Sequence, residues 1–118
     1  MNAFEKGKEE YETGRWSKAY KLFRQAASER DSVEEVRILM ARCLLAMGDP
    51  VRAEQELRDV KEILSERDQE LLIEFEKAWK SLEDTKLLDA NELRHRRESA
   101  GAAADDPADS PETPSADD

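Results

Sequence analysis

The chain has little of what small proteins use for covalent or metal-based stabilisation. Its 118 residues include one cysteine, Cys43, and one histidine, His95. A lone cysteine cannot form an intramolecular disulfide, and a lone histidine cannot assemble the Cys and His ligands of a zinc site. The four glycines are scattered, so no glycine-rich loop is present to hold a phosphate. We therefore expect no disulfide framework, no metal site and no cofactor.

Long apolar runs are also missing. No stretch approaches the ~18 apolar residues that cross a bilayer, and charged residues begin at Glu5. We expect no membrane contact and no signal peptide, and we expect a cytoplasmic protein. Catalysis would require a nucleophile beside a base, paired carboxylates in a concave site or a metal cluster. The sequence indicates none of these, so we do not expect an enzyme.

Charged, helix-forming residues are abundant instead. Charged residues make up 41% of the chain and aromatic residues 6%, a composition that predicts an all-α fold. Residues 101–118 carry six acidic residues, three prolines and no basic residue. Such a segment buries too little apolar surface to offset its ordering entropy, so we expect a disordered acidic tail. Its role is either to keep the protein in solution or to regulate binding.

The remainder of the chain repeats itself with a period of 34 residues, the spacing between Gly14 and Gly48. Small residues are needed where two antiparallel helices approach closely, and large apolar residues fill the space beside them. On this register small residues match small ones and large match large: Gly7 with Ala41, Tyr11 with Leu45, Ala19 with Ala53, Phe23 with Leu57, and Ala26 with Val60. The pattern predicts a helix, turn, helix unit used twice.

These positions resemble the tetratricopeptide-repeat (TPR) family, whose period is also 34 residues. The resemblance covers about residues 2–64 and implies antiparallel helical hairpins. The residues that carry it are Gly7, Tyr11, Gly14, Trp16, Ala19, Phe23 and Ala26, followed by Ala41, Leu45, Gly48, Ala53, Leu57 and Val60.

Local signals indicate where the helices begin and end. The run Gly48–Pro50 combines a helix-ending glycine, a capping aspartate and a proline suited to a first turn. Ser32 with Glu35 and Ser65 with Asp68 are typical of capping boxes. We expect helices near residues 2–13, 16–29, 33–47, 50–64 and 66–83.

The expected domain organisation follows from these boundaries. A TPR-like domain occupies residues 1–83, with repeats at about 2–31 and 33–64 and a capping helix at about 66–83. A loosely ordered helical segment follows at 84–100, and then the tail at 101–118.

The last of these five helices has the character of a cap. Shifting Ala41 by one period reaches Phe75, a bulky residue where both repeats have a small one, and this disfavours close packing of a sixth helix. Charged residues occupy the remaining positions of the helix, which is what the end of a repeat array requires. Its apolar stripe comprises Leu71, Leu72, Phe75, Ala78, Trp79 and Leu82.

The resemblance implies a concave groove lined by the first helix of each hairpin and by the cap. Lys8 and Arg42 would pair with acidic groups, while Tyr11 and Trp79 would supply anchor area. This chemistry suits a peptide or helix of another protein that carries apolar and acidic side chains. The alternative is that Tyr11, Leu45 and Trp79 are simply buried between helices. The expected groove residues are Phe4, Lys8, Tyr11, Glu12, Ile38, Arg42, Leu45, Leu72, Glu76, Trp79 and Lys80.

The expected function is therefore that of a protein–protein interaction module, acting as an adaptor, an assembly factor or a client-specific chaperone. The alternative is a self-assembling scaffold, such as a homodimer, or an accessory subunit of a larger complex. The basic run Arg94–Arg97 is too narrow for a nucleic-acid contact in an acidic protein, so we expect a solvated helix end. Cys43 is expected to pack in the core.

Overall fold

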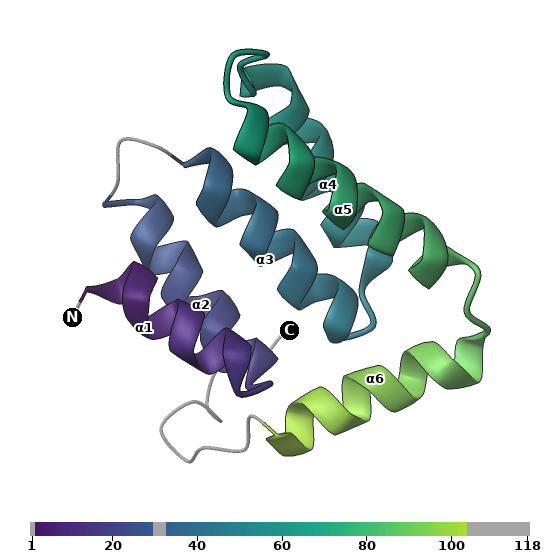
Figure 1. Ribbon diagram of the computed structural model, residues 1–118. Coiled ribbons are helices and arrows are strands. Elements are labelled where there is room, and N and C mark those ends of the chain that lie inside the picture. The colour runs from purple at the N-terminus through teal and green to yellow at the C-terminus, as the bar shows by residue number, and fades with distance from the viewer. Residues whose placement is uncertain (1, 30–32, 104–118) are drawn as a thin grey trace.

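Six α-helices and no strand form the described part of the chain, residues 2–29 and 33–103, in this computed structural model (Figure 1). The all-α prediction is confirmed, and the first four helices agree with their expected ranges to within two residues. The helices are α1 Ala3–Glu12, α2 Trp16–Ala27, α3 Glu34–Ala46, α4 Pro50–Ile63, α5 Gln69–Lys86 and α6 Ala90–Ala103.

The first four helices form two stacked antiparallel hairpins, α1 with α2 and α3 with α4, and α5 packs on the second hairpin (Figure 1). Gly14 and Gly48 lie in the two turns with φ of +82° and +80°, a backbone conformation that glycine adopts without steric cost. Asp49 caps α4 through its Oδ1, which accepts a hydrogen bond from the Arg52 amide at 3.2 Å. The predicted signal at Gly48–Pro50 is therefore confirmed.

Close helix approach within the hairpins depends on the predicted small residues. Ala19, Ala41 and Ala53 are fully buried, and a Cβ atom on Gly7 would lie only 2.7 Å from Cε1 of Phe23. The core has two parts, one between α1, α2 and α3 and one between α3, α4 and α5, and Tyr20 and Met47 pack against both. Helix α3 thus lies at the centre of the molecule.

Helix α5 begins later than expected. Asp68, and not Ser65, is its N-cap, because Asp68 Oδ1 accepts a hydrogen bond from the Leu71 amide at 3.1 Å. Ser65 Oγ instead accepts from the Arg67 amide, in the turn before the helix. The capping helix therefore spans Gln69–Lys86 rather than 66–83. Ser32, the cap predicted for the second repeat, lies outside the described residues.

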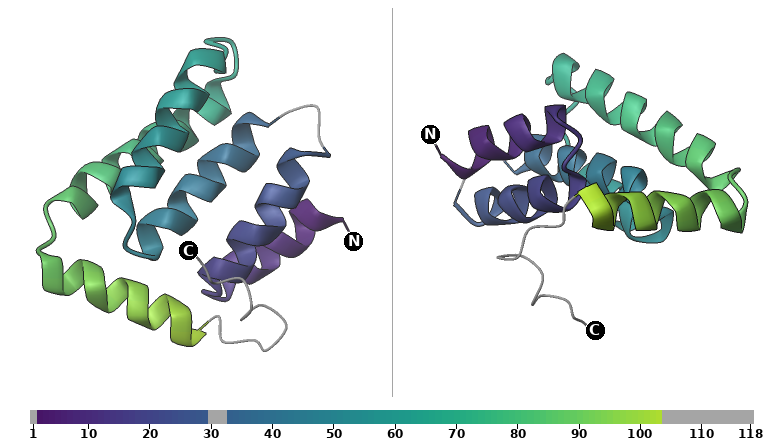
Figure 2. Two further views of the ribbon diagram at one scale, coloured as in Figure 1. Left: turned by 180° about the vertical axis from the view of Figure 1, so that it is seen from behind. Right: turned by 90° about the horizontal axis from the view of Figure 1, so that it is seen from below.

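The segment expected to be loosely ordered contains a regular helix. Helix α6 is capped by Asp89, whose Oδ1 accepts from the Glu92 amide at 2.8 Å, and it continues through Ala103. Contrary to the expectation from Phe75, a sixth helix does pack on the domain, although not against α5 as a hairpin partner. It crosses beneath the turn ends of the hairpins and contacts α2 and α3 (Figures 1 and 2). The rest of the expected tail, residues 104–118, lies outside the described part.

Candidate functional site

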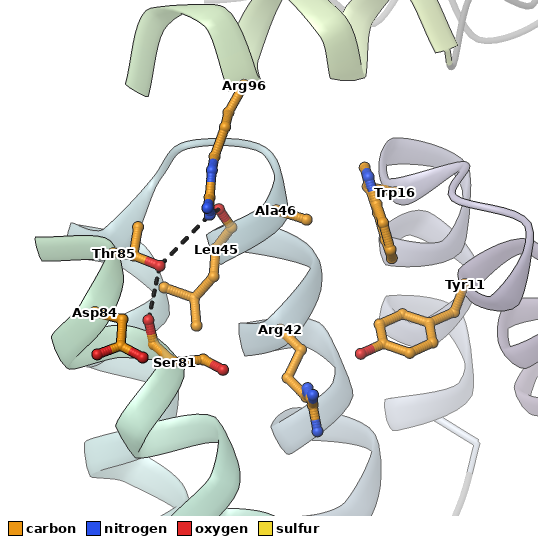
Figure 3. Close-up of a pocket in the computed structure, with 9 residues that line it drawn as sticks. All are labelled: Tyr11, Trp16, Arg42, Leu45, Ala46, Ser81, Asp84, Thr85 and Arg96. Carbon is orange, nitrogen blue, oxygen red and sulfur yellow. Dashed lines mark hydrogen bonds between the residues drawn. The ribbon is translucent and has the colours of Figure 1, made fainter. Parts of the chain in front are cut away.

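Two depressions lie along α3, on the face that is flanked by α1 and α5. We call the first, of about 440 Å³, the carboxylate depression; it is lined by Lys8, Glu35, Ile38, Leu39, Glu70, Ile73 and Glu74. We call the second, of about 300 Å³, the α6 depression (Figure 3); it is lined by Tyr11, Trp16, Arg42, Leu45, Ala46, Ser81, Asp84, Thr85 and Arg96. We call the two depressions together the groove.

Helix α3 provides the floor of both depressions, because residues on one side of the helix, in successive turns, line first one depression and then the other. Ile38 and Leu45 are 2% and 3% exposed, so they lie at the bottom of the groove. An ion pair between α3 and α5 marks the border between the depressions, with Arg42 Nη1 3.7 Å from Glu74 Oε1. The sequence thus places an apolar floor between walls that carry charge.

Arg96 joins the α6 depression from the far end of the described chain. Its Nη1 donates to the Leu45 carbonyl at 3.1 Å and to Thr85 Oγ1 at 3.5 Å (Figure 3). The neighbouring Arg97 donates from Nε to the Gly48 carbonyl at 3.1 Å. The Leu45 carbonyl belongs to the last turn of α3 and the Gly48 carbonyl to the turn that follows, and the C-terminal end of a helix favours a cation. Helix α6 is therefore fixed as the end wall of the groove.

The basic run consequently differs at Arg96 from the solvated helix end that we expected. Arg94, His95 and Arg97 are exposed, whereas Arg96 is half-buried. The positive charge does complement a helix C-terminus, but it is that of α3 and not of α6. No local pattern could indicate this, since the accepting carbonyls are 51 and 49 residues earlier in the chain.

Tyr11 and Trp16 form the aromatic wall of the α6 depression. Their ring centroids are 5.2 Å apart in an edge-to-face arrangement. Burial raises the pKa of the Tyr11 hydroxyl above its usual value, an effect that Arg42 partly opposes. The hydroxyl thus remains protonated at neutral pH and can both donate and accept a hydrogen bond.

Five of the expected groove residues do line the groove: Lys8, Tyr11, Ile38, Arg42 and Leu45. The alternative of simple core packing holds for Leu45, which is buried, while Tyr11 is only half-buried. Two expected residues of α1 lie outside the lining. Phe4 is half-buried beneath the Lys8 ammonium, which is 5.2 Å from its ring centroid. Glu12 is exposed.

The four expected groove residues of α5 lie elsewhere. Glu76, Trp79 and Lys80 line a separate depression of about 260 Å³ that also involves Lys61 of α4, and helical spacing places Leu72 on the same side of α5. The reason is the rotation of α5. Burial of Phe75, Ala78 and Leu82 against the second hairpin places these four residues on the flank beside Phe75, which lines the same depression. The wrong assignment of these α5 residues to the groove came from extending the 34-residue period to α5.

Helix α5 starts 35 residues after α3, from Glu34 to Gln69. Each residue corresponds to a rotation of roughly 100° around an α-helix. Adding 34 to the residue numbers of α3 therefore gives positions one residue away from the equivalent ones in α5, and these positions lie on a different face of the helix. A shift of 35 takes Glu35 to Glu70 and Ile38 to Ile73, which do line the groove.

Several groove residues were missed by the sequence reasoning. Glu35 lies one helical turn before Ile38, and Leu39 lies one helical turn before Arg42, so the periodicity of α3 could have indicated them. The α5 residues required the correct register, and Arg96 had no local signal. The missed residues are Trp16, Glu35, Leu39, Ala46, Glu70, Ile73, Glu74, Ser81, Asp84, Thr85 and Arg96.

The described residues provide little for other chemistry. Burial raises the pKa of the Cys43 thiol to about 12, so the residue is a packing element, as expected, and not an accessible nucleophile. Within residues 2–29 and 33–103 no cluster of three or more His, Cys, Asp and Glu side chains could hold a metal ion. None of the described helices combines the length and the apolar character that a membrane span requires.

Comparison with known proteins identifies the repeat. The sequence model of the tetratricopeptide repeat family matches residues 10–70, slightly more than half of the chain. The chain belongs to the tetratricopeptide-repeat family. Searches of curated proteins and of solved structures found no match to this TPR protein. TPR repeats generally mediate protein–protein interaction and are generally not enzymes. The matched region includes both glycine turns, whereas α6 lies beyond it.

Proposed function

We propose that this TPR protein binds a peptide or helix of another protein in the groove along α3. The observation that carries the proposal is an exposed apolar side chain within a depression. Ile73 is 51% exposed and lines the same depression as the half-buried Leu39 on the facing helix. Concave surfaces that combine apolar side chains with a few polar groups are typical binding sites.

The α6 depression supplies groups that would bind an acidic side chain. Arg42 is 30% exposed at its side chain, and a guanidinium forms strong charge-assisted hydrogen bonds with a carboxylate. The Tyr11 and Trp16 rings beside it offer aromatic contact area of the kind that dominates many interfaces. The proposed ligand therefore carries apolar and acidic side chains.

The proposed roles are those of an adaptor, an assembly factor or a client-specific chaperone in the cytoplasm. The net charge of −10 disfavours contact with nucleic acid or with an anionic membrane surface. All three roles require the same recognition of a peptide or helix.

A selection from random linear peptides on the immobilised full chain tests the groove. We expect the recovered peptides to be rich in apolar and acidic residues. Ile73→Glu places a charge in the groove and should weaken their binding by at least about tenfold. Val51→Glu is the matched control, because Val51 is 79% exposed on α4 and does not line the groove. Equal binding to both variants would move the site to another surface.

A second candidate is self-assembly as a scaffold, a homodimer or an accessory subunit. It is favoured by the flank of α5 that α6 leaves uncovered. There the rings of Phe75 and Trp79 are stacked with centroids 6.0 Å apart, beside Lys61 and Glu76. If this flank pairs with a second copy, the mass measured by sedimentation rises with protein concentration, and Trp79→Glu returns it to that of one chain.

A further inference from the structure

We infer that the segment bound in the groove carries a lysine or arginine at the carboxylate depression, opposite in sign to the acidic side chain at the α6 depression. This inference rests on the proposed function and specifies the ligand more closely. Three carboxylates and one ammonium line the carboxylate depression, with Glu35 on α3 facing Glu70 and Glu74 on α5 and with Lys8 on α1.

Two of these carboxylates are without a cationic partner among the described residues. In the part of the chain that the structure describes, Glu35 and Glu70 take part in no ion pair, whereas Glu74 lies 3.7 Å from both Arg42 and Lys77. The Lys8 ammonium is placed over the ring of Phe4. The two walls of the depression thus present negative charge that a ligand would have to match.

The apolar side chains of the carboxylate depression favour a long basic side chain as the ligand group. Ile38, Leu39 and Ile73 lie among the carboxylates. Lysine and arginine bury their methylene groups against apolar surface while the charged head remains at a polar site. A guanidinium can also bind carboxylates in a bidentate way. A small inorganic cation would make no use of these apolar side chains.

The other end of the groove has the opposite sign. Arg42 and Arg96 line the α6 depression, and its single carboxylate, Asp84, lies 4.0 Å from the Lys80 ammonium. A ligand inserted in reverse would place its basic group beside two arginines and its acidic group beside Glu35 and Glu70. Like charges brought together at an interface reject that arrangement. The groove therefore fixes the direction of the bound segment.

Peptides recovered on the full wild-type chain test this polarity. We expect a basic residue at a constant distance in sequence from an acidic one, and we expect the basic residue to lose its enrichment when the selection uses the Glu35→Gln/Glu70→Gln variant. Glu70→Lys should weaken a recovered peptide by about tenfold. Replacing the basic residue of that peptide by glutamate should restore binding to Glu70→Lys.

The matched control is Glu83→Lys, an exposed carboxylate on the other side of the same helix, which should leave affinity unchanged. Binding that is lost in Ile73→Glu but unaltered in Glu70→Lys would overturn the polarity while leaving the groove as the site. Binding that survives Ile73→Glu as well would overturn the proposed function itself.

Discussion

Gly48 meets two separate requirements at a single residue. Its φ of +80° lies in the left-handed region, and helix α6 packs directly against it. A Cβ atom there would collide with the Leu93 carbonyl oxygen and would lie 3.1 Å from Cγ of Arg97. Gly14 has the same backbone conformation, but its nearest neighbour would be Cζ2 of Trp16 at 3.9 Å. A side chain added at Gly14 would thus strain only the backbone, whereas one added at Gly48 would strain the backbone and also collide with α6.

Alanine substitution at each glycine should measure the two costs. Gly14→Ala is expected to lower the free energy of unfolding by about 1 kcal/mol, the cost of a left-handed alanine. Gly48→Ala is expected to lower it by about 3 kcal/mol, because α6 must also move. Urea unfolding followed by circular dichroism provides the comparison. Equal losses for the two variants would show that α6 does not press on the turn.

The sequence predicted both glycines as turn residues, because the repeat aligns them and Asp49 and Pro50 mark the next helix. It could not predict the contact with Leu93. That contact joins residues far apart in the chain, and predicting it would have required the positions of α5 and of the helix that follows it. The local sequence therefore predicted the turn at Gly48 but not the packing of α6 against it.

At the scale of the helix, α6 depends on a few polar anchors. Its main helix contacts are with α2 and α3, and among its described side chains Ala100 is the buried apolar one. Arg96 donates to the Leu45 carbonyl of α3 and to Thr85 of α5, and Arg97 donates to the Gly48 carbonyl in the turn after α3. A helix held in this way gains little from apolar burial, so single hydrogen bonds decide its stability.

Arg96→Met should therefore release α6 selectively. The variant keeps an unbranched side chain but loses the hydrogen bonds to the Leu45 carbonyl and Thr85. We expect amide hydrogen exchange in α6 to become about tenfold faster, while the amides of α3 remain protected. Arg94→Met is the control, since Arg94 is exposed and bonds only to Asn91 of its own helix. Unchanged exchange in Arg96→Met would contradict the anchoring.

Helices α5 and α6 show how far sequence reasoning reached at this scale. The existence and apolar stripe of α5 were predictable from its spacing of three and four residues. Its groove side was not, because one extra residue before the helix rotates it by roughly 100°. Helix α6 has no strong apolar stripe, so its order could not be read from periodicity. Its order depends on Asp89 at its start and on carbonyl groups of a distant turn.

At the scale of the whole molecule, several contacts link the two hairpins. The two core clusters meet at α3, where Tyr20 and Met47 pack against both. Arg52 of α4 adds a hydrogen bond from Nη2 to the Tyr20 hydroxyl of α2 at 2.9 Å. Helix α6 then ties the end of the described chain to the turn of the second hairpin. These links favour a single cooperative transition.

The two tryptophans can report on two different parts of the molecule, the first hairpin and α5. Trp16 lies at the start of α2, and Trp79 lies on the outer flank of α5. In the single-tryptophan variants Trp16→Phe and Trp79→Phe, we expect the fluorescence transition in urea to coincide with the loss of helical circular dichroism. Transitions that separate would instead indicate repeats that unfold one by one, coupled only to their neighbours.

The position of α6 also sets an order in time. During synthesis the chain leaves the ribosome from its N-terminus, and N-terminal parts fold first. The carboxylate depression needs no residue beyond Glu74, whereas the α6 depression needs Arg96. On this order the groove is first built with one end open: Arg42 is already in place on α3, and the wall that carries Arg96 is added only when the last described helix has emerged.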